Sequence, residues 1–224
     1  MTNTIQEAML GRGIVPLAVI AADGKVHRCG TSARPKGTDA AYVLFEDGRG
    51  GGFQNHADGL GWEDWQADIG RTWTSEEQAT FQERVVTARK TREDEAARKR
   101  DVAAELAEQI WRKAAPCGEH VYLTRKGVQS HGLRVFDSNL VIPLFTASGK
   151  LASLQTITPD GTKRFLPGGR KHGCYFILGT PGEILGLAEG YATAATVHKA
   201  TGYAVAVAFD CGNLLPVARA LKSS

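Results

Sequence analysis

The sequence predicts an α+β protein: a small antiparallel β module, a long charged helix, a basic β-rich region and a β-α-β unit. Three observations carry this prediction. Short alternating runs are broken by glycine turns, one stretch of about forty residues lacks Pro and Gly, and a strand-helix-strand pattern lies near the carboxyl end. We therefore divide the chain into residues 1–73, 74–115, 116–181 and 182–224.

The composition is that of a globular protein with a substantial core. Of 224 residues, 42% are hydrophobic and 23% charged, and the net charge of +3 does not by itself indicate nucleic-acid binding. The four cysteines are far apart, which argues against a zinc site and a disulfide framework. No segment has a signal-peptide layout or the ~20 apolar residues that span a bilayer. We expect a cytoplasmic protein with no membrane partner.

Residues 1–73 are expected to form the antiparallel β module. Thr4 and Glu7 have the spacing of a capping box, which opens a short helix. Residues 17–22 and 25–28 are expected to pair as a hairpin around an Asp-Gly turn.

Three tryptophans, Trp62, Trp65 and Trp73, are expected to give this module its aromatic core. His27 and Cys29 are its one metal-like pair. Two ligands do not make a zinc site, so we expect no zinc.

Residues 74–115 are expected to form the long helix, which begins with a capping box at either Thr74 or Ser75. Residues 87–101 mix both charges and contain no apolar side chain larger than Ala. They predict a solvated connector, either one helix or two with a hinge; a basic face on DNA is the alternative. An apolar stripe is expected to dock on the next domain through Val102, Leu106 and Ile110, flanked by Ala103, Ala107 and Trp111.

The third region concentrates positive charge on a chain that is expected to be β-like from residue 121 to 178. Residues 118–179 hold eight basic and three acidic side chains, so their net charge of +5 exceeds that of the whole chain. Such segregation is expected for binding polyanions, although a basic edge that prevents aggregation is the alternative. The candidate phosphate-binding residues are Arg125, Lys126, Arg134, Lys163, Arg164, Arg170, Lys171 and His172.

The last region predicts the β-α-β unit. Residues 184–188 and 204–209 are apolar runs of strand length, and a helix over 191–200 is stopped by Gly202. Glu189 sits where the first strand ends, the position at which α/β sheets bind ligands. We expect it to serve as a metal ligand or in acid/base chemistry. The alternative is a glutamate stabilised by the helix dipole.

The order of these motifs resembles the catalytic core of the Toprim-domain DNA primases. The nearest branch is that of the plasmid- and phage-borne TraC-type primases and primase/helicases. The resemblance covers essentially the whole chain. It rests on an Arg-Val-Phe and Val-Ile-Pro strand pair, a Gly-Lys turn, a loop that runs from Lys-Arg-Phe-Leu to Gly-Gly-Arg-Lys-His-Gly, and Leu-Ala-Glu-Gly-Tyr followed by the β-α-β unit.

This resemblance implies a partial Toprim fold for residues 182–224 and specific roles for the candidate residues. Glu189 would act as acid or base on the incoming nucleotide or 3′ hydroxyl, near the metals. Arg134, Lys163 and Arg164 would hold template and nucleotide phosphates, and Arg170 and Lys171 would extend that groove. The implied cofactor is Mg²⁺ or Mn²⁺. The implied partners are single-stranded DNA and nucleoside triphosphates, together with a helicase part or a replication protein.

The sequence departs from this family in its metal ligands. The family carries an Asp-x-Asp on the strand after the one that ends near Phe209, and this sequence contains no Asp-x-Asp. Glu189 and Asp210 alone make an incomplete site. We therefore expect the chain to be inactive in primer synthesis by itself, as a piece of a longer primase or as a short relative. The alternative function is a non-catalytic module of a mobile element that holds nucleic acid or blocks a host protein in counter-defence.

Overall fold

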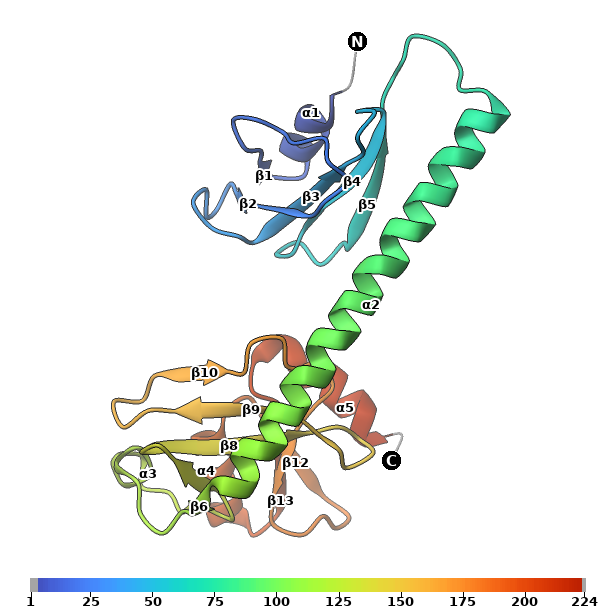
Figure 1. Ribbon diagram of the computed structural model, residues 1–224. Helices are drawn as coiled ribbons and strands as arrows, with labels where there is room; N and C mark the ends of the chain where they lie inside the picture. The colour runs from blue at the N-terminus through green and yellow to red at the C-terminus, as the bar shows by residue number, and fades with distance from the viewer. Residues whose placement is uncertain (1–3, 223–224) are drawn as a thin grey trace. The chain divides into compact units, whose positions relative to one another are not determined.

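The computed structural model describes residues 4–222 and confirms the α+β class (Figure 1). The sheets are largely antiparallel, and one helix of 39 residues, α2, runs from Ser75 to Lys113. The chain divides into two compact units, one ending at Glu93 and the other beginning at Asp94. The four segments predicted from sequence are thus distributed over two units. No helix within residues 4–222 is long and apolar enough to cross a membrane.

The N-terminal unit is a five-stranded antiparallel sheet in chain order, preceded by a short helix. Its elements are α1 (Ile5–Gly11), β1 (Ile14–Val15), β2 (His27–Thr31), β3 (Ala40–Leu44), β4 (Gly50–Asn55) and β5 (Trp62–Gln66). The predicted capping box at Thr4 and Glu7 is present. Its core packs α1 against one face of the sheet, through Ile5 and Met9 on the helix and Tyr42 and Phe53 on the strands.

Two predictions for this unit are wrong. Residues 17–22 form no strand, and β2 pairs instead with β1, with Ile14 opposite Thr31. The Asp-Gly turn lies inside a longer connection, where the Lys25 N–H donates to the Asp23 carboxylate at 3.0 Å.

The aromatic core also differs, since Trp65 alone of the three tryptophans is buried. Trp62 lies beneath the guanidinium of Arg92, and Trp73 contacts the Phe81 ring edge-on. Both tryptophans therefore pack against the first part of α2 and not in the core of the sheet.

Three consecutive glycines on β4 allow this part of α2 and the neighbouring side chains to approach the sheet. A Cβ at Gly50 would lie 2.6 Å from the Phe81 ring, and one at Gly52 would lie 2.4 Å from the Trp62 indole nitrogen. Both distances are far below van der Waals contact, so no larger residue fits without displacing an aromatic side chain.

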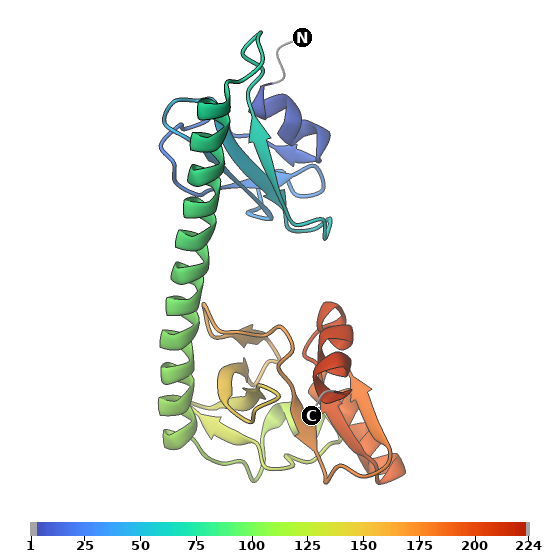
Figure 2. The ribbon, with the colours of Figure 1, turned by 90° about the vertical axis from the view of Figure 1, so that its right-hand side faces the viewer.

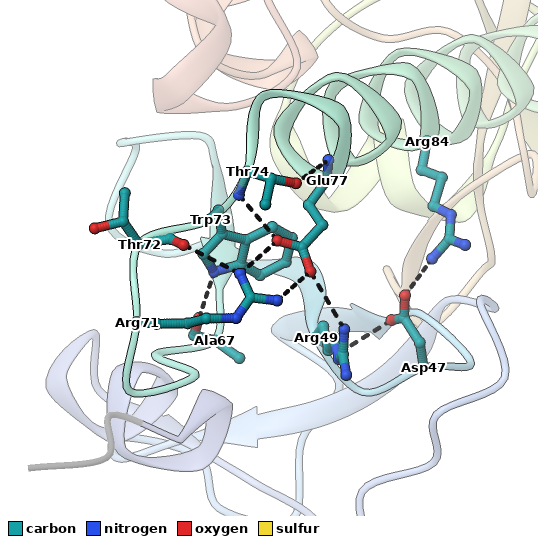
Figure 3. Close-up of polar contacts among 9 residues, drawn as sticks. All are labelled: Asp47, Arg49, Ala67, Arg71, Thr72, Trp73, Thr74, Glu77 and Arg84. Carbon is teal, nitrogen blue, oxygen red and sulfur yellow. Dashed lines mark hydrogen bonds and ion pairs between the residues drawn. The ribbon is translucent and has the colours of Figure 1, made fainter.

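Helix α2 begins at the Thr74 capping box rather than at Ser75. The Glu77 N–H donates to Thr74 Oγ1 at 3.2 Å, and the Thr74 N–H donates to the Glu77 carboxylate at 2.9 Å (Figure 3). Arg71 donates to both carboxylate oxygens at 2.8 and 2.6 Å, and Arg49 lies 3.7 Å away. The hydrogen bonds from Arg71 and the Thr74 backbone lower the pKa of Glu77 to about 2.

The remainder of α2 belongs to the C-terminal unit, and its docking stripe differs from the predicted one. Ala103 and Ala107 are buried, and Ala107 packs with Val141 and Leu154, while Ile110 and Trp111 pack alongside. Val102 and Leu106 are exposed, at 66% and 44%. At Ala103 and Ala107 the helix is covered by the sheet, while the neighbouring Val102 and Leu106 project to solvent. Residues 87–101 form one helix without a break.

The C-terminal unit contains two sheets that share one hydrophobic core. The first is antiparallel, in the order β10-β9-β8-β7-β6, and its strands lie side by side in Figure 1. Its elements, with the intervening helix, are β6 (Ala115–Pro116), α3 (Val121–Lys126), β7 (Arg134–Phe136), β8 (Asn139–Phe145), β9 (Leu151–Ile157) and β10 (Lys163–Phe165).

The second sheet has the order β11-β13-β12 and contains the predicted β-α-β unit. Strands β12 (Leu185–Ala188) and β13 (Ala204–Val207) are parallel and joined by α4 (Tyr191–Thr201), which ends at Gly202 in the left-handed conformation. Strand β11 (Phe176–Leu178) is antiparallel to β13. After a 3₁₀ turn at Cys211–Asn213, α5 (Leu214–Lys222) packs beside this sheet (Figure 2).

The prediction that residues 121–126 are β-like is wrong, because they form α3. Its N-cap is His120, whose imidazole accepts a hydrogen bond from the Tyr122 N–H at 3.2 Å, and its C-cap is the left-handed Gly127. Histidine is not among the preferred N-cap residues, which hides this six-residue helix in the sequence.

We predict that Glu77→Gln destabilises the N-terminal unit in a pH-dependent way. The pKa of Glu77 lies at about 2 in the folded protein, against an ordinary 4.5, so its ionised form stabilises the fold. That contribution is complete above pH 4.5 and is lost as the pH falls through about 2. Amide hydrogen exchange of β3–β5 measures the free energy of unfolding of this unit. The difference in that free energy between wild type and variant should become smaller below pH 4.5. A gap that stays constant down to pH 2.5 would contradict the assignment.

Candidate functional site

The carboxyl ends of β12 and β13 meet at one edge of the three-stranded sheet. Ala188 is paired with Val207, so the residues that follow, Glu189 on one strand and Phe209 with Asp210 on the other, emerge together. Glu189 is exposed. Phe209 is buried and has a φ of +74°, a left-handed conformation that is uncommon for a bulky residue.

A basic loop, residues 166–175, is fastened to this edge by Asn213. The Gly173 N–H donates to Asn213 Oδ1 at 2.8 Å. Asn213 Nδ2 lies 3.1 Å from the Lys171 carbonyl, 3.1 Å from that of Cys174 and 2.8 Å from that of Ala208. Asn213 is 2% exposed, so these bonds are shielded from water. The loop backbone is therefore held at the end of β13.

Strand β10 lies on the other side of the same edge. The Phe165 ring meets the Phe209 ring edge-on, with centroids 6.1 Å apart. A Cβ built on Gly190 would lie 3.7 Å from the Lys163 ammonium nitrogen. Lys163 is therefore next to the backbone that directly follows Glu189. Side chains alternate along a strand, so Lys163 and Phe165 share this face of β10 and Arg164 projects from the opposite face.

Lys171 completes this arrangement. Its ammonium forms an ion pair with Asp210 Oδ2 and lies 5.3 Å from the centroid of the Phe165 ring. The other oxygen, Asp210 Oδ1, accepts a hydrogen bond from the Asn213 N–H at 2.9 Å. We call the surface formed by Lys163, Phe165, Lys171 and the residues at the strand ends the edge crevice.

The residues of the edge crevice do not fit a divalent metal cage. Asp210 is already engaged by an ammonium and a backbone N–H, which leaves Glu189 as the carboxylate beside Lys163. Between residues 4 and 222, no three His, Cys, Asp or Glu side chains are grouped as metal ligands. Hard cations such as Mg²⁺ need several oxygen ligands, so these positions alone do not hold one.

Two other candidate residues belong to the same loop. The Arg170 Nε donates to the His172 carbonyl at 3.1 Å, which folds the guanidinium back over its own loop. His172 is exposed. Burial raises the pKa of the neighbouring Cys174 thiol, so that group stays protonated and structural.

The remaining candidates lie elsewhere in the unit. Arg125 donates to the Asp160 carbonyl at 3.0 Å, in the turn between β9 and β10, and Lys126 is exposed at the end of α3. Arg134 donates to the Trp111 carbonyl at 2.6 Å, with its guanidinium 4.5 Å above the indole ring. Arg134 thus fastens the end of α2 to β7.

Sequence reasoning missed Asn213, Phe165 and Tyr191. Tyr191 is buried directly after Gly190, and its hydroxyl donates to the Gln129 carbonyl at 2.8 Å, fixing the start of α4. Burial raises the Tyr191 pKa, so the hydroxyl remains a donor. The spacing of Asp210 and Asn213 is an N-cap signal, but nothing in the sequence shows that the Asn213 side chain reaches back about forty residues.

We predict that Asn213→Ala destabilises the C-terminal unit by about 3 kcal/mol, because buried loop groups lose their partners. Chemical denaturation should measure this loss, and hydrogen exchange should show residues 166–175 exchanging faster. Asn139→Ala is the matched control. The Asn139 side chain makes one exposed bond to a nearby carbonyl, so its loss should change stability by no more than about 0.5 kcal/mol. Equal effects of the two variants would show that the Asn213 bonds do not hold the loop.

Comparison with models of known protein families gave no match, and neither did comparison with solved structures. Two curated Escherichia coli proteins named DNA primase TraC are both 36% identical to this chain, over 214 and 219 residues. Each alignment covers 90% of this chain but only 20% and 14% of the relative. The chain therefore spans a fifth or less of the length of these relatives. The identity along nearly all of its own length shows that the chain is related to one part of the TraC-type DNA primases.

Proposed function

We propose that the C-terminal unit binds single-stranded DNA and nucleotide phosphates in the edge crevice, as part of a Toprim-type primase. The observation that carries this proposal is the meeting of Lys163 and Lys171 at the carboxyl edge of the parallel strands, beside Glu189. The names of the two relatives support a primase context. The Toprim assignment of residues 182–224 is supported by the parallel β12-α4-β13 unit with a glutamate directly after its first strand.

Electrostatics favours a polyanion at this surface. The basic excess of residues 118–179 falls largely on exposed side chains, and Lys163 and Arg170 are exposed in and near β10, whereas Arg164 projects from the opposite face of that strand. A strand that neutralises its phosphates on such groups releases its condensed counterions, which drives binding. Arg125, at the end of α3, contacts the β9–β10 turn at Asp160, three residues before β10 begins at Lys163, and would extend the contact.

Glu189 is the acid/base candidate within this proposal. Its carboxylate is exposed at the strand end, and the Lys163 ammonium is near the adjacent backbone. Phosphoryl transfer depends on positioning and on positive charge around the transferred group. Lys163 and Lys171 would supply that charge, and Glu189 would hold or accept a proton from the attacking hydroxyl.

Binding without catalysis is the second candidate function. It is favoured by Asp210, which pairs with Lys171 instead of standing free as a metal ligand. In this case residues 4–222 would hold a strand independently of Mg²⁺, and chain extension would need ligands that these residues do not supply. The two candidates share the edge crevice and differ in whether the strand is extended.

We predict that Lys163→Ala lowers affinity for a single strand and makes log affinity less steeply dependent on log salt, by about 0.7 for one lost phosphate contact. Fluorescence anisotropy with a labelled oligonucleotide, at several salt concentrations, measures both quantities. Lys199→Ala is the charge-matched control. Lys199 is exposed in the last turn of α4, at the opposite end of that helix from Glu189. If both variants bind as wild type does, the strand does not occupy the edge crevice.

A further inference from the structure

An aromatic ring is exposed in the middle of the edge crevice. Phe165 is the last residue of the three-residue strand β10 and is 36% exposed. Lys163 and Lys171 belong to the same crevice. A single exposed apolar side chain is common on protein surfaces, so the exposure of this ring matters only together with the charges beside it. The ring also packs edge-on against Phe209, which is 8% exposed.

One ammonium group, that of Lys171, lies over this ring, and a second, that of Lys163, comes from the same face of the strand. Lys171 Nζ is 5.3 Å from the ring centroid, within the range of a cation–π contact. Lys163 projects from the same face of β10 toward Gly190. A single strand offers a π face and two flanking phosphates at every nucleotide, whereas the bases of a duplex are stacked on one another. A partly exposed ring with one cation over it and a second on the same face of the strand therefore matches one nucleotide of a single strand.

We propose that Phe165 is a stacking platform for one nucleobase of a bound single strand, with Lys163 and Lys171 contacting the phosphates beside that base. This inference rests on the proposed function, because it requires the strand to lie in the edge crevice. Phe209 packs edge-on against the Phe165 ring. Every base has a π face, so the platform is indifferent to sequence and selects single strands over duplexes.

The test compares two strands of equal length and charge, one carrying bases and one built of abasic spacers. Wild type should bind the base-carrying strand more tightly. Phe165→Leu keeps apolar bulk but loses the aromatic face, so it should lower affinity for the base-carrying strand by roughly tenfold and leave the abasic strand unchanged. Phe165→Trp should restore the affinity. The leucine variant must retain wild-type thermal unfolding, which isolates the loss of the ring from loss of the fold.

The outcomes separate this inference from the proposal on which it rests. If Lys163→Ala weakens binding but Phe165→Leu does not, the crevice binds phosphate and the platform is wrong. If wild type binds both strands equally, the platform is also wrong. If neither substitution changes binding, the proposed function fails together with the platform. A wild-type dimer that Phe165→Leu dissociates would assign the ring to contact between two copies of the chain and overturn the inference.

Discussion

The hydrogen bonds of one side chain, Asn213, hold the basic loop of the C-terminal unit against the end of β13. They join the carbonyls of Lys171, Cys174 and Ala208 and the N–H of Gly173, and so bring a loop that precedes β11 to the end of β13. The ends of the loop are also fixed by backbone hydrogen bonds of Leu166 and Tyr175, and Asn213 adds the junction between its middle and the end of β13. Because buried polar groups must be paired, the same bonds that stabilise the loop also fix which of its residues face the end of β13.

The Lys171 ammonium at the crevice is positioned by an ion pair that is partly open to solvent. Lys171 is paired with Asp210, and both side chains are partly exposed, at 42% and 31%. The proposed binding therefore requires a phosphate to compete with Asp210 for this ammonium. Asp210 thus positions Lys171 when no strand is present, and the left-handed Phe209 just before it turns the chain so that its ring supports Phe165. The same ion pair that orients the Lys171 ammonium also occupies Asp210, the second carboxylate of this edge.

The sequence predicted those parts of the fold that depend on local signals. The β-α-β unit carries apolar runs, an alanine-rich helix and a glycine stop, and it was found within one or two residues of its limits. Helix α3 was missed because a histidine caps it, and the docking stripe of α2 was misassigned because close packing favours Ala107 over Leu106. The sequence identified the basic candidate residues as one group, but it did not predict that the structure places them on different surfaces. Arg134 lies against Trp111 and Arg164 on the far face of β10, which depends on strand pairing that no local pattern contains.

The central claim is that a single strand lies between β10, the basic loop and the ends of β12 and β13. Photo-crosslinking tests it most directly: the full chain is irradiated with an oligonucleotide that carries a photoreactive thymidine analogue, and the modified peptides are identified by mass spectrometry. The account predicts adducts within residues 163–173 and in the segments around Glu189 and Phe209. Adducts confined to the N-terminal unit, or to α3 and the Trp111 region, would contradict it.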